Sequence, residues 1–283
     1  MTKKKYIKCP LNYVGGKTKL LPQILPFFPK EIDTFYDIFL GGGNVLCNVE
    51  ANKYVGIEKN PYVCGLLNMC NNISVEELDS KILEYYEEYN LSKENREGFL
   101  QIRDSYNNDK GNFIKLFTVI SNAFNNQIRF NRKGEYNMPF GKNRSSYNDN
   151  MRNNLYNFFT FIKTHNVDIL NESFEKVLEL ELNKGSFIYA DPPYYISTAT
   201  YNENNGWGEE DELKLYETLD KINDLEVKFA LSNVVNHNGQ ENAILSNWMR
   251  KYNVNYLDFN YANSSYHKKD KSKDTNEILV TNY

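Results

Sequence analysis

The sequence predicts an α/β protein whose core is divided in two by a helical insert. Short apolar runs with strand composition occur early and late in the chain, and segments with helical spacing lie beside them. Between about residues 72 and 160 the periodicity is mainly helical. With 283 residues, of which 41% are hydrophobic, the chain can bury a full core as one large domain or two small ones.

The first block of the predicted core covers residues 35–60. "FYDIFL" (35–40) is a short apolar run that ends in "GGGN", "VLCNVEA" (45–51) follows at helical spacing, and "KYVGIEKN" (53–60) is a second apolar run. The order strand, glycine turn, helix, strand is that of a βαβ unit. We therefore expect two strands joined through a helix over 45–51.

The second block lies near the end of the chain. "GSFIYADPPY" (185–194) and "VKFALSN" (227–233) read as apolar, aromatic-rich strands, and an amphipathic helix is predicted over 209–223 between them. The insert carries three segments with helical spacing, 75–89, 95–107 and 112–124. They are followed by the basic, aperiodic stretch "NNQIRFNRKGEYNMPFGKNRSS".

Composition argues against several classes of protein. The four cysteines, at positions 9, 47, 64 and 70, form no Cys-x-x-Cys pair, and with only three histidines neither a zinc site nor a disulfide framework is indicated. The basic N-terminal segment is not followed by the apolar run of a secretory signal, and no stretch of 18 apolar residues is present to span a membrane. We therefore expect a soluble protein of the reducing cytoplasm, without a bound metal.

The net charge of −4 is distributed unevenly. Residues 1–30 contain seven lysines and no acid, and residues 115–152 contain seven basic residues against two acidic ones. A third basic group comprises Lys268, Lys269, Lys271 and Lys273. This segregation allows a basic face for phosphate contacts on an acidic protein. Ordinary solvated charge runs remain the alternative for each segment taken alone.

The stretch "NYVGGKTK" (12–19) looks like part of a phosphate-binding loop. Such a loop needs a glycine five residues before Gly16, where this chain has Leu11, and an apolar strand before it, where this chain has lysines and a proline. The segment therefore does not predict ATP binding.

The first chemical motif is Asp37-x-Phe39-x-Gly41-x-Gly43, placed where a strand ends. Glycines at such a turn let a ligand approach the backbone, and Glu58, after the next strand, is placed to accept hydrogen bonds from ribose hydroxyls. The spacing lacks the third glycine of a dinucleotide motif, so NAD is disfavoured and another adenosine-containing ligand is favoured. A simple tight turn is the alternative.

The second motif, Asp191-Pro192-Pro193-Tyr194, directly follows a predicted strand. Successive prolines keep the chain extended, and Pro192 offers a carbonyl oxygen but no NH. The Asp191 carboxylate and the Pro192 carbonyl can therefore act as two neighbouring acceptors, which suits an amino group on a planar ring, with Tyr194 available for stacking. A rigid turn after a strand is the alternative.

The order of "GGK", "DIFLGGG", a long insert and "DPPY" resembles that of the Dam-like DNA adenine methyltransferases, the D12 class of the alpha group. "IRFNRKGEYNMPFG" is similar to the target-recognition stretch of that family, and "YNENNGW" and "NEILVTNY" are similar to its phage-encoded and low-GC bacterial members. The resemblance implies a Rossmann-like S-adenosylmethionine-dependent methyltransferase core, residues 1–71 and 161–283. Residues 72–160 would form a helical target-recognition domain.

The resemblance also implies an activity, the transfer of a methyl group from S-adenosylmethionine to the exocyclic amino group of adenine in duplex DNA. The base would be flipped out of the helix, with GATC as a candidate site. The catalytic residues would be Asp191, Pro192, Pro193 and Tyr194. The cofactor-binding residues would be Tyr13, Gly15, Lys17, Asp37, Phe39, Gly41, Gly43, Glu58, Phe174 and Asp191.

The DNA-binding residues implied in the same way are Lys17, Asn126, Arg129, Asn131, Lys133, Asn137, Pro139, Lys142 and Arg144. Arg129 is suited to a guanine edge and Asn125, Asn126 and Asn137 to adenine, whereas Lys133, Lys142 and Arg144 suit phosphates. The expected partner is double-stranded DNA. The protein is expected to be a monomer in solution and to act in the bacterial cytoplasm or, if it is phage-encoded, in the host cytoplasm. Two alternatives stay open, a catalytically inactive DNA-binding homologue and an adenine methyltransferase that acts on RNA.

Overall fold

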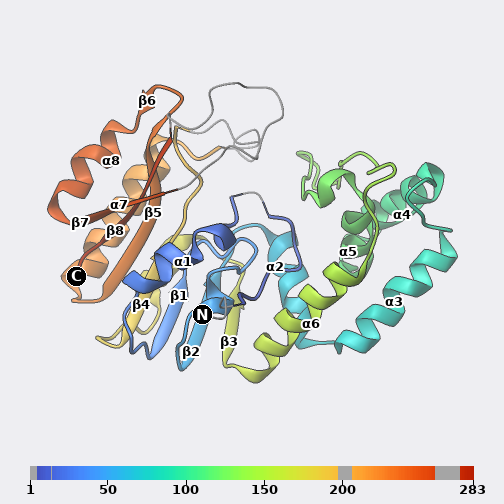
Figure 1. Ribbon diagram of the computed structural model, residues 1–283, viewed down its shortest axis with the longest axis horizontal. Helices are drawn as coiled ribbons and strands as arrows, with labels where there is room; N and C mark the ends of the chain where they lie inside the picture. Colours follow the sequence, from blue (N-terminus) through green and yellow to red (C-terminus); the bar gives the residue numbers. More distant parts are fainter. Residues whose placement is uncertain (1–4, 14, 197–205, 259–274) are drawn as a thin grey trace. The chain divides into compact units, whose positions relative to one another are not determined.

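The computed structural model describes residues 5–13, 15–196, 206–258 and 275–283 (Figure 1). The chain divides into two compact units. Unit 1 comprises Met1–Thr18, Gly41–Asn48 and Glu58–Asn171, and unit 2 comprises Lys19–Leu40, Val49–Ile57 and Glu172–Tyr283. The basic group at 268–273, two of the N-terminal lysines and most of "YNENNGW" lie outside the described residues.

Unit 2 is built on a mixed sheet with the strand order β2-β1-β4-β5-β8-β7. β2, β1, β4 and β5 are parallel to one another, whereas β8 runs antiparallel to β5 and β7, and β6 pairs antiparallel with the end of β5. The strands are β1 Thr34–Asp37, β2 Lys53–Ile57, β4 Ser186–Ala190, β5 Lys228–His237, β6 Gln240–Glu241, β7 Asn253–Leu257 and β8 Thr275–Thr281. The four strands predicted from apolar runs are confirmed.

Aromatic side chains pack against this sheet and between the helices of unit 2. Phe28 packs edge-on against Phe187 of β4, with ring centroids 4.8 Å apart, and Trp248 stacks on Tyr216 at 4.4 Å. The five residues of β4 are all buried, as expected for a central parallel strand. The helices and turns are α1 Leu21–Ile24, η2 Leu25–Phe27, η6 Phe174–Glu179, α7 Glu209–Asp224, α8 Ala243–Trp248 and η8 Met249–Lys251.

Unit 1 is mainly helical, and the three predicted helices of the insert are confirmed. Its helices and strand are α2 Pro61–Asn68, α3 Val75–Glu88, α4 Arg96–Asn108, α5 Phe113–Asn122, α6 Asp149–Thr164 and β3 Val167–Leu170. Its 3-10 turns are η3 Leu46–Asn48, η4 Met69–Asn71 and η5 Phe124–Asn126, and η1 Lys17–Lys19 begins in this unit. In the described part of the chain, none of the helices combines the length and apolar character needed to cross a bilayer.

The helix predicted over 45–51 is wrong, because the structure forms only the short turn η3 there. The Asn48 side chain donates to the carbonyls of Ile7 and Asn44 and accepts from the Ile7 NH, with distances of 2.8 to 2.9 Å. Asparagine side chains that bond the backbone in this way compete with helical hydrogen bonds. The segment between β1 and β2 is therefore fixed to the N-terminal residues instead of forming a helix.

Candidate active site

In unit 2, two acidic side chains lie where neighbouring parallel strands end. Asp37 is the last residue of β1 and is buried, and Asp191 directly follows β4. β1 and β4 are parallel, and Asp37 pairs in register with Tyr189. The carboxyl edge of parallel strands is where α/β proteins bind ligands, so these acids occupy the expected place for a site.

The hydroxyl of Tyr194 joins this edge to β8. It donates to Glu277 Oε1 at 2.9 Å and also lies 3.3 Å from Asp191 Oδ1. Glu277 is 1% exposed and is a residue of β8. The Tyr194 hydroxyl therefore links Asp191 to Glu277, a buried acid that was not among the residues predicted from the sequence.

The pKa of the buried Tyr189 hydroxyl reflects the negative charge at the same edge of the sheet. Burial raises this pKa well above its ordinary value, and the charges of Asp191, Asp37 and Glu277 raise it further. The carboxyl groups of Asp37 at the end of β1, Asp191 after β4 and Glu277 of β8 thus all act on this hydroxyl. Their combined negative potential suits a ligand that carries positive charge.

Three aromatic rings form a second cluster in unit 2. Phe39, two residues after β1, stacks on Phe174 with ring centroids 5.2 Å apart and planes 26° apart. Trp207 meets Phe39 edge-on at 5.4 Å and Phe174 at 5.8 Å. Phe39 and Trp207 are each partly exposed, whereas Phe174 is buried. Such a cluster presents the flat apolar surface that a planar base requires.

A buried carboxylate fixes Trp207 in this cluster. Glu212 of α7 is fully buried and accepts hydrogen bonds from the Trp207 indole NH, the Tyr216 hydroxyl, and the side-chain amides of Asn233 and Asn242, over 2.5 to 3.1 Å. A buried carboxylate is tolerated when several donors satisfy it, as they do here. No local sequence pattern predicts this network, because its members are up to 35 residues apart.

In unit 1, the glycine turn and the acid that follows β2 come together. Gly41 and Gly43 have φ angles of 49° and 74°, and the Gly41 NH donates to Glu58 Oε2 at 2.9 Å. The other carboxylate oxygen accepts from the Asn60 NH at 2.7 Å. Burial raises the pKa of Glu58 to about 7, and these two backbone bonds lower it in part.

The N-terminal loop packs on this turn. The ring of Tyr13 lies 3.0 Å from where a Cβ on Gly41 would stand. Asn44, the residue after Gly43, accepts from the Cys9 NH and the Thr18 hydroxyl, both at 3.0 Å. Lys17 is buried and its ammonium lies 3.4 Å from the Gly15 carbonyl. Tyr13, Gly15 and Lys17 are thus gathered with Gly41, Gly43 and Glu58 in one unit.

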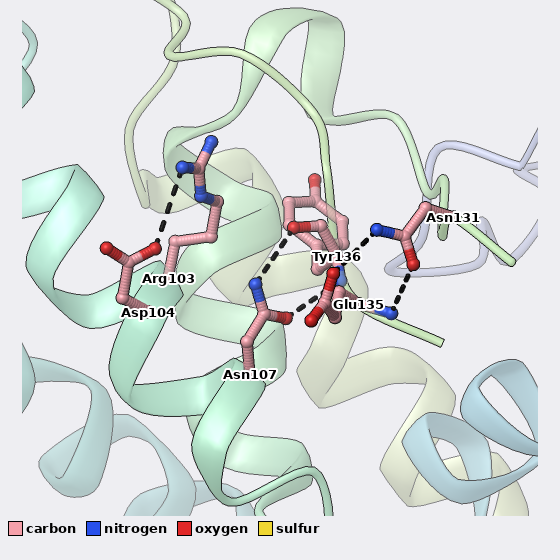
Figure 2. Close-up of polar contacts among 6 residues, drawn as sticks. All are labelled: Arg103, Asp104, Asn107, Asn131, Glu135 and Tyr136. Carbon is pink, nitrogen blue, oxygen red and sulfur yellow. Dashed lines mark hydrogen bonds and ion pairs between the residues drawn. The ribbon is translucent and has the colours of Figure 1, made fainter. Parts of the chain in front are cut away.

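The basic stretch of the insert forms a hairpin, with an isolated antiparallel bridge between Phe130 and Tyr136. Figure 2 shows how α4 and the turn hold it: the Asn107 side chain accepts from the Tyr136 NH at 2.8 Å and donates to the Tyr136 carbonyl at 3.2 Å. Asn131 closes the turn by accepting from the NH groups of Lys133 and Glu135 and donating to the Glu135 carboxylate. The predicted contact residue Asn131 therefore also shapes the hairpin.

Arg129 is held by another residue of the predicted DNA-binding set. Its Nε donates to Asn137 Oδ1 at 2.9 Å and its Nη2 to the Asn137 carbonyl at 3.1 Å. The Nη1 group takes no part in this pair. The guanidinium is thereby oriented while it remains exposed at the surface.

The remaining predicted DNA-binding residues are spread along the basic stretch. Asn126 has a φ of 52°, and its side chain donates to the Ser121 carbonyl at 2.8 Å. The Arg144 guanidinium lies 5.3 Å from the ring centre of Phe124, a side chain that is 39% exposed. Lys133, Pro139 and Lys142 are exposed.

Comparison with known proteins places this chain in a family. Residues 13–275 match the D12 class N6 adenine-specific DNA methyltransferases. The chain is 44% identical over 286 residues to the modification methylase StsI of Streptococcus sanguinis, an alignment that covers 99% of this chain and 43% of the relative. It is also 44% identical over 282 residues to the type II methyltransferase M.FokI of Planomicrobium okeanokoites, covering 98% of this chain and 43% of that protein.

A more distant relative is the DNA adenine methylase of Salmonella typhimurium, 28% identical over 195 residues, which covers 68% of this chain and 66% of that protein. The chain spans less than half the length of the two relatives at 44% identity. The family match nevertheless extends over nearly all of this sequence, including the glycine turn, the insert and the Asp191–Tyr194 motif. The chain therefore belongs to the D12 class of N6 adenine-specific DNA methyltransferases.

Proposed function

We propose that this chain transfers a methyl group from S-adenosylmethionine to the exocyclic amino group of adenine in duplex DNA. The observation that carries the proposal is the Asp191–Tyr194 motif at the carboxyl edge of β4, next to Asp37 at the end of β1. Family membership supports the reaction type.

The predicted cofactor-binding residues fit the chemistry of S-adenosylmethionine. When bound, this cofactor supplies an electrophilic methyl group on a positively charged sulfur. Asp37 contributes negative charge that suits the cationic methionine end, and the stacked rings of Phe39 and Phe174 suit the adenine base. Glu58 carries carboxylate oxygens that can accept from ribose hydroxyls.

The two acceptors of the Asp191–Tyr194 motif activate the target amino group. Its lone pair is conjugated with the purine ring, which makes the nitrogen a weak nucleophile. Hydrogen bonds from the amino group to the Asp191 carboxylate and the Pro192 carbonyl localise the lone pair and orient it. Positive charge then forms on the nitrogen, and the fixed negative charge of Asp191 stabilises it. The nitrogen keeps both protons while its new bond to carbon forms and the carbon–sulfur bond breaks, and the cationic nitrogen then releases one proton to solvent.

The base must leave the duplex for this chemistry, at a cost of a few kcal/mol. Stacking on Tyr194 offsets part of that cost. Arg129, oriented by Asn137, is suited to a bidentate contact with guanine, and the exposed Lys133, Lys142 and Arg144 are suited to phosphates. We assign residues 72–160 the role of target recognition.

The proposal is tested by incubating the chain with tritiated S-adenosylmethionine and either duplex DNA or structured RNA. Transfer to duplex DNA at adenine N6 is expected. Transfer to RNA alone would indicate the RNA-directed alternative, and DNA binding without transfer to either would indicate an inactive homologue. Sequencing methylated adenines in DNA from cells that express the chain then gives the target sequence, with GATC examined first.

A further inference from the structure

The β8 segment "NEILVTNY" contains a buried acid with no role in the function proposed above. Glu277 is 1% exposed and pairs in the sheet with Val234 of β5 and Leu257 of β7. A carboxyl group placed among apolar strand residues is costly unless donors satisfy it. One donor is the Tyr194 hydroxyl, at 2.9 Å.

The hydroxyl of Tyr194 carries one proton and lies between two carboxyl groups. Glu277 Oε1, at 2.9 Å, is closer to it than Asp191 Oδ1, at 3.3 Å. Because one proton makes one strong hydrogen bond, the shorter contact takes it. The Asp191 carboxylate then does not have to accept the phenolic proton, and its acceptor capacity can be directed to the target amino group.

We propose that Glu277 is a positioning residue for methyl transfer, which binds the Tyr194 hydroxyl, fixes the orientation of the stacking ring and keeps the phenolic proton away from Asp191. This inference rests on the function proposed above. Glu277 acts through Tyr194 and does not itself touch the base. Its charge, near Tyr189 with those of Asp37 and Asp191, also adds to the negative potential at the edge of the sheet where the nitrogen becomes cationic.

The test is a double-mutant cycle with Glu277→Gln, Tyr194→Phe and the double variant. A carboxamide accepts more weakly than a carboxylate and can instead donate to the phenol, which turns the phenolic proton toward Asp191. Each single variant should lower kcat by about five- to twentyfold, with KM for S-adenosylmethionine unchanged within about twofold. The double variant should be no slower than the slower single variant, because both remove the same interaction.

Glu217→Gln is the control, since Glu217 is an exposed residue of α7. It should leave kcat at the wild-type value. Tyr194→Phe retains the ring and removes only the hydroxyl, so the inference can be tested even if Glu277→Gln does not fold. Wild-type kcat in either single variant, or losses that multiply in the double variant, would overturn the inference while the proposed function stands. A wild-type chain that transfers no methyl group would overturn both.

Discussion

At the scale of single residues, the candidate site combines side chains with different electrostatic tasks. Asp191 is half-buried and stands beside the Tyr194 hydroxyl, whereas Glu58 is buried and bonded to two backbone NH groups. The first is suited to contact a group that becomes positively charged. The second is suited to hydroxyl donors, and its protonation depends on pH in the neutral range.

Asp191→Ala is expected to abolish methyl transfer, because it removes one of the two acceptors that activate the amino group. Binding of S-adenosylmethionine and of DNA should stay within about tenfold, since the lost interaction is strongest in the transition state. Transfer assays and calorimetry measure the two effects. Asp224→Ala, at an exposed position at the end of α7, should behave as wild type. Substantial turnover by Asp191→Ala would show that the catalytic assignment is incorrect.

A second residue-scale prediction concerns the pH dependence of cofactor binding. Burial raises the pKa of Glu58 to about 7 from an ordinary value near 4.5, so the folded chain favours its protonated form. The contribution of this group to the stability of the folded chain is complete below pH 4.5 and is lost as the pH rises through 7. Ribose hydroxyls donate best to the ionised form, so affinity for S-adenosylhomocysteine should rise about tenfold from pH 6 to pH 8.

Calorimetry across this pH range measures the slope of affinity for S-adenosylhomocysteine against pH. Glu58→Gln should bind more weakly and without this pH dependence, whereas Glu97→Gln, an exposed acid of α4, should retain it. An unchanged slope in Glu58→Gln would assign the titration to another group.

At the scale of elements, the turn between β1 and η3 shows why its glycines are required. Gly41 has a positive φ and lies under the ring of Tyr13, while its NH is bonded to Glu58. The side chains of Asn44 and Asn48 then connect the turn to the N-terminal residues. The turn is therefore shaped by contacts with two other segments of unit 1.

Gly41→Val should lower the affinity for S-adenosylmethionine by about tenfold or more, because a branched side chain disfavours this backbone conformation and collides with Tyr13. The matched control is Gly239→Val, since Gly239 has a φ of 78° but nothing within 4 Å of an added Cβ. It introduces the backbone strain without the collision and should bind the cofactor normally. Equal affinity in both variants would mean that this turn does not contact the cofactor.

The basic stretch of the insert, residues 125–146, is the segment in which two proposed side-chain roles can be separated. If Arg129 contacts guanine, Arg129→Ala should cost about 1 to 3 kcal/mol on the preferred sequence and relax the choice at one base position. If Lys142 contacts a phosphate, Lys142→Ala should weaken binding to all DNA sequences about equally. It should also lower the slope of log affinity against log salt concentration by about one. Methylation profiles and salt titrations distinguish the two results. The reverse pattern would exchange the two roles.

At the scale of the whole molecule, the sequence predicted the elements with strong periodicity and missed those defined by distant contacts. The buried runs of β4 and β5 and the amphipathic α7 were identified because their patterns are local. The segment 45–51 has helical spacing as well, but it forms only a 3-10 turn, and Asn48 bonds to the distant Ile7 backbone. No local pattern shows that Glu277 reaches Tyr194, 83 residues away.

Many helices of this asparagine-rich chain begin in the same way. An asparagine side-chain oxygen accepts from a backbone NH in the first turn of α2, α4, α5, α6 and α8. An aspartate would cap as well, at about 1 kcal/mol of stabilisation, but it would add a negative charge and would titrate in acid. Neutral caps avoid both effects. For a chain proposed to bind DNA, a polyanion, such caps begin the helices without adding repulsion, and the helices keep their caps in acidic conditions that protonate carboxylates.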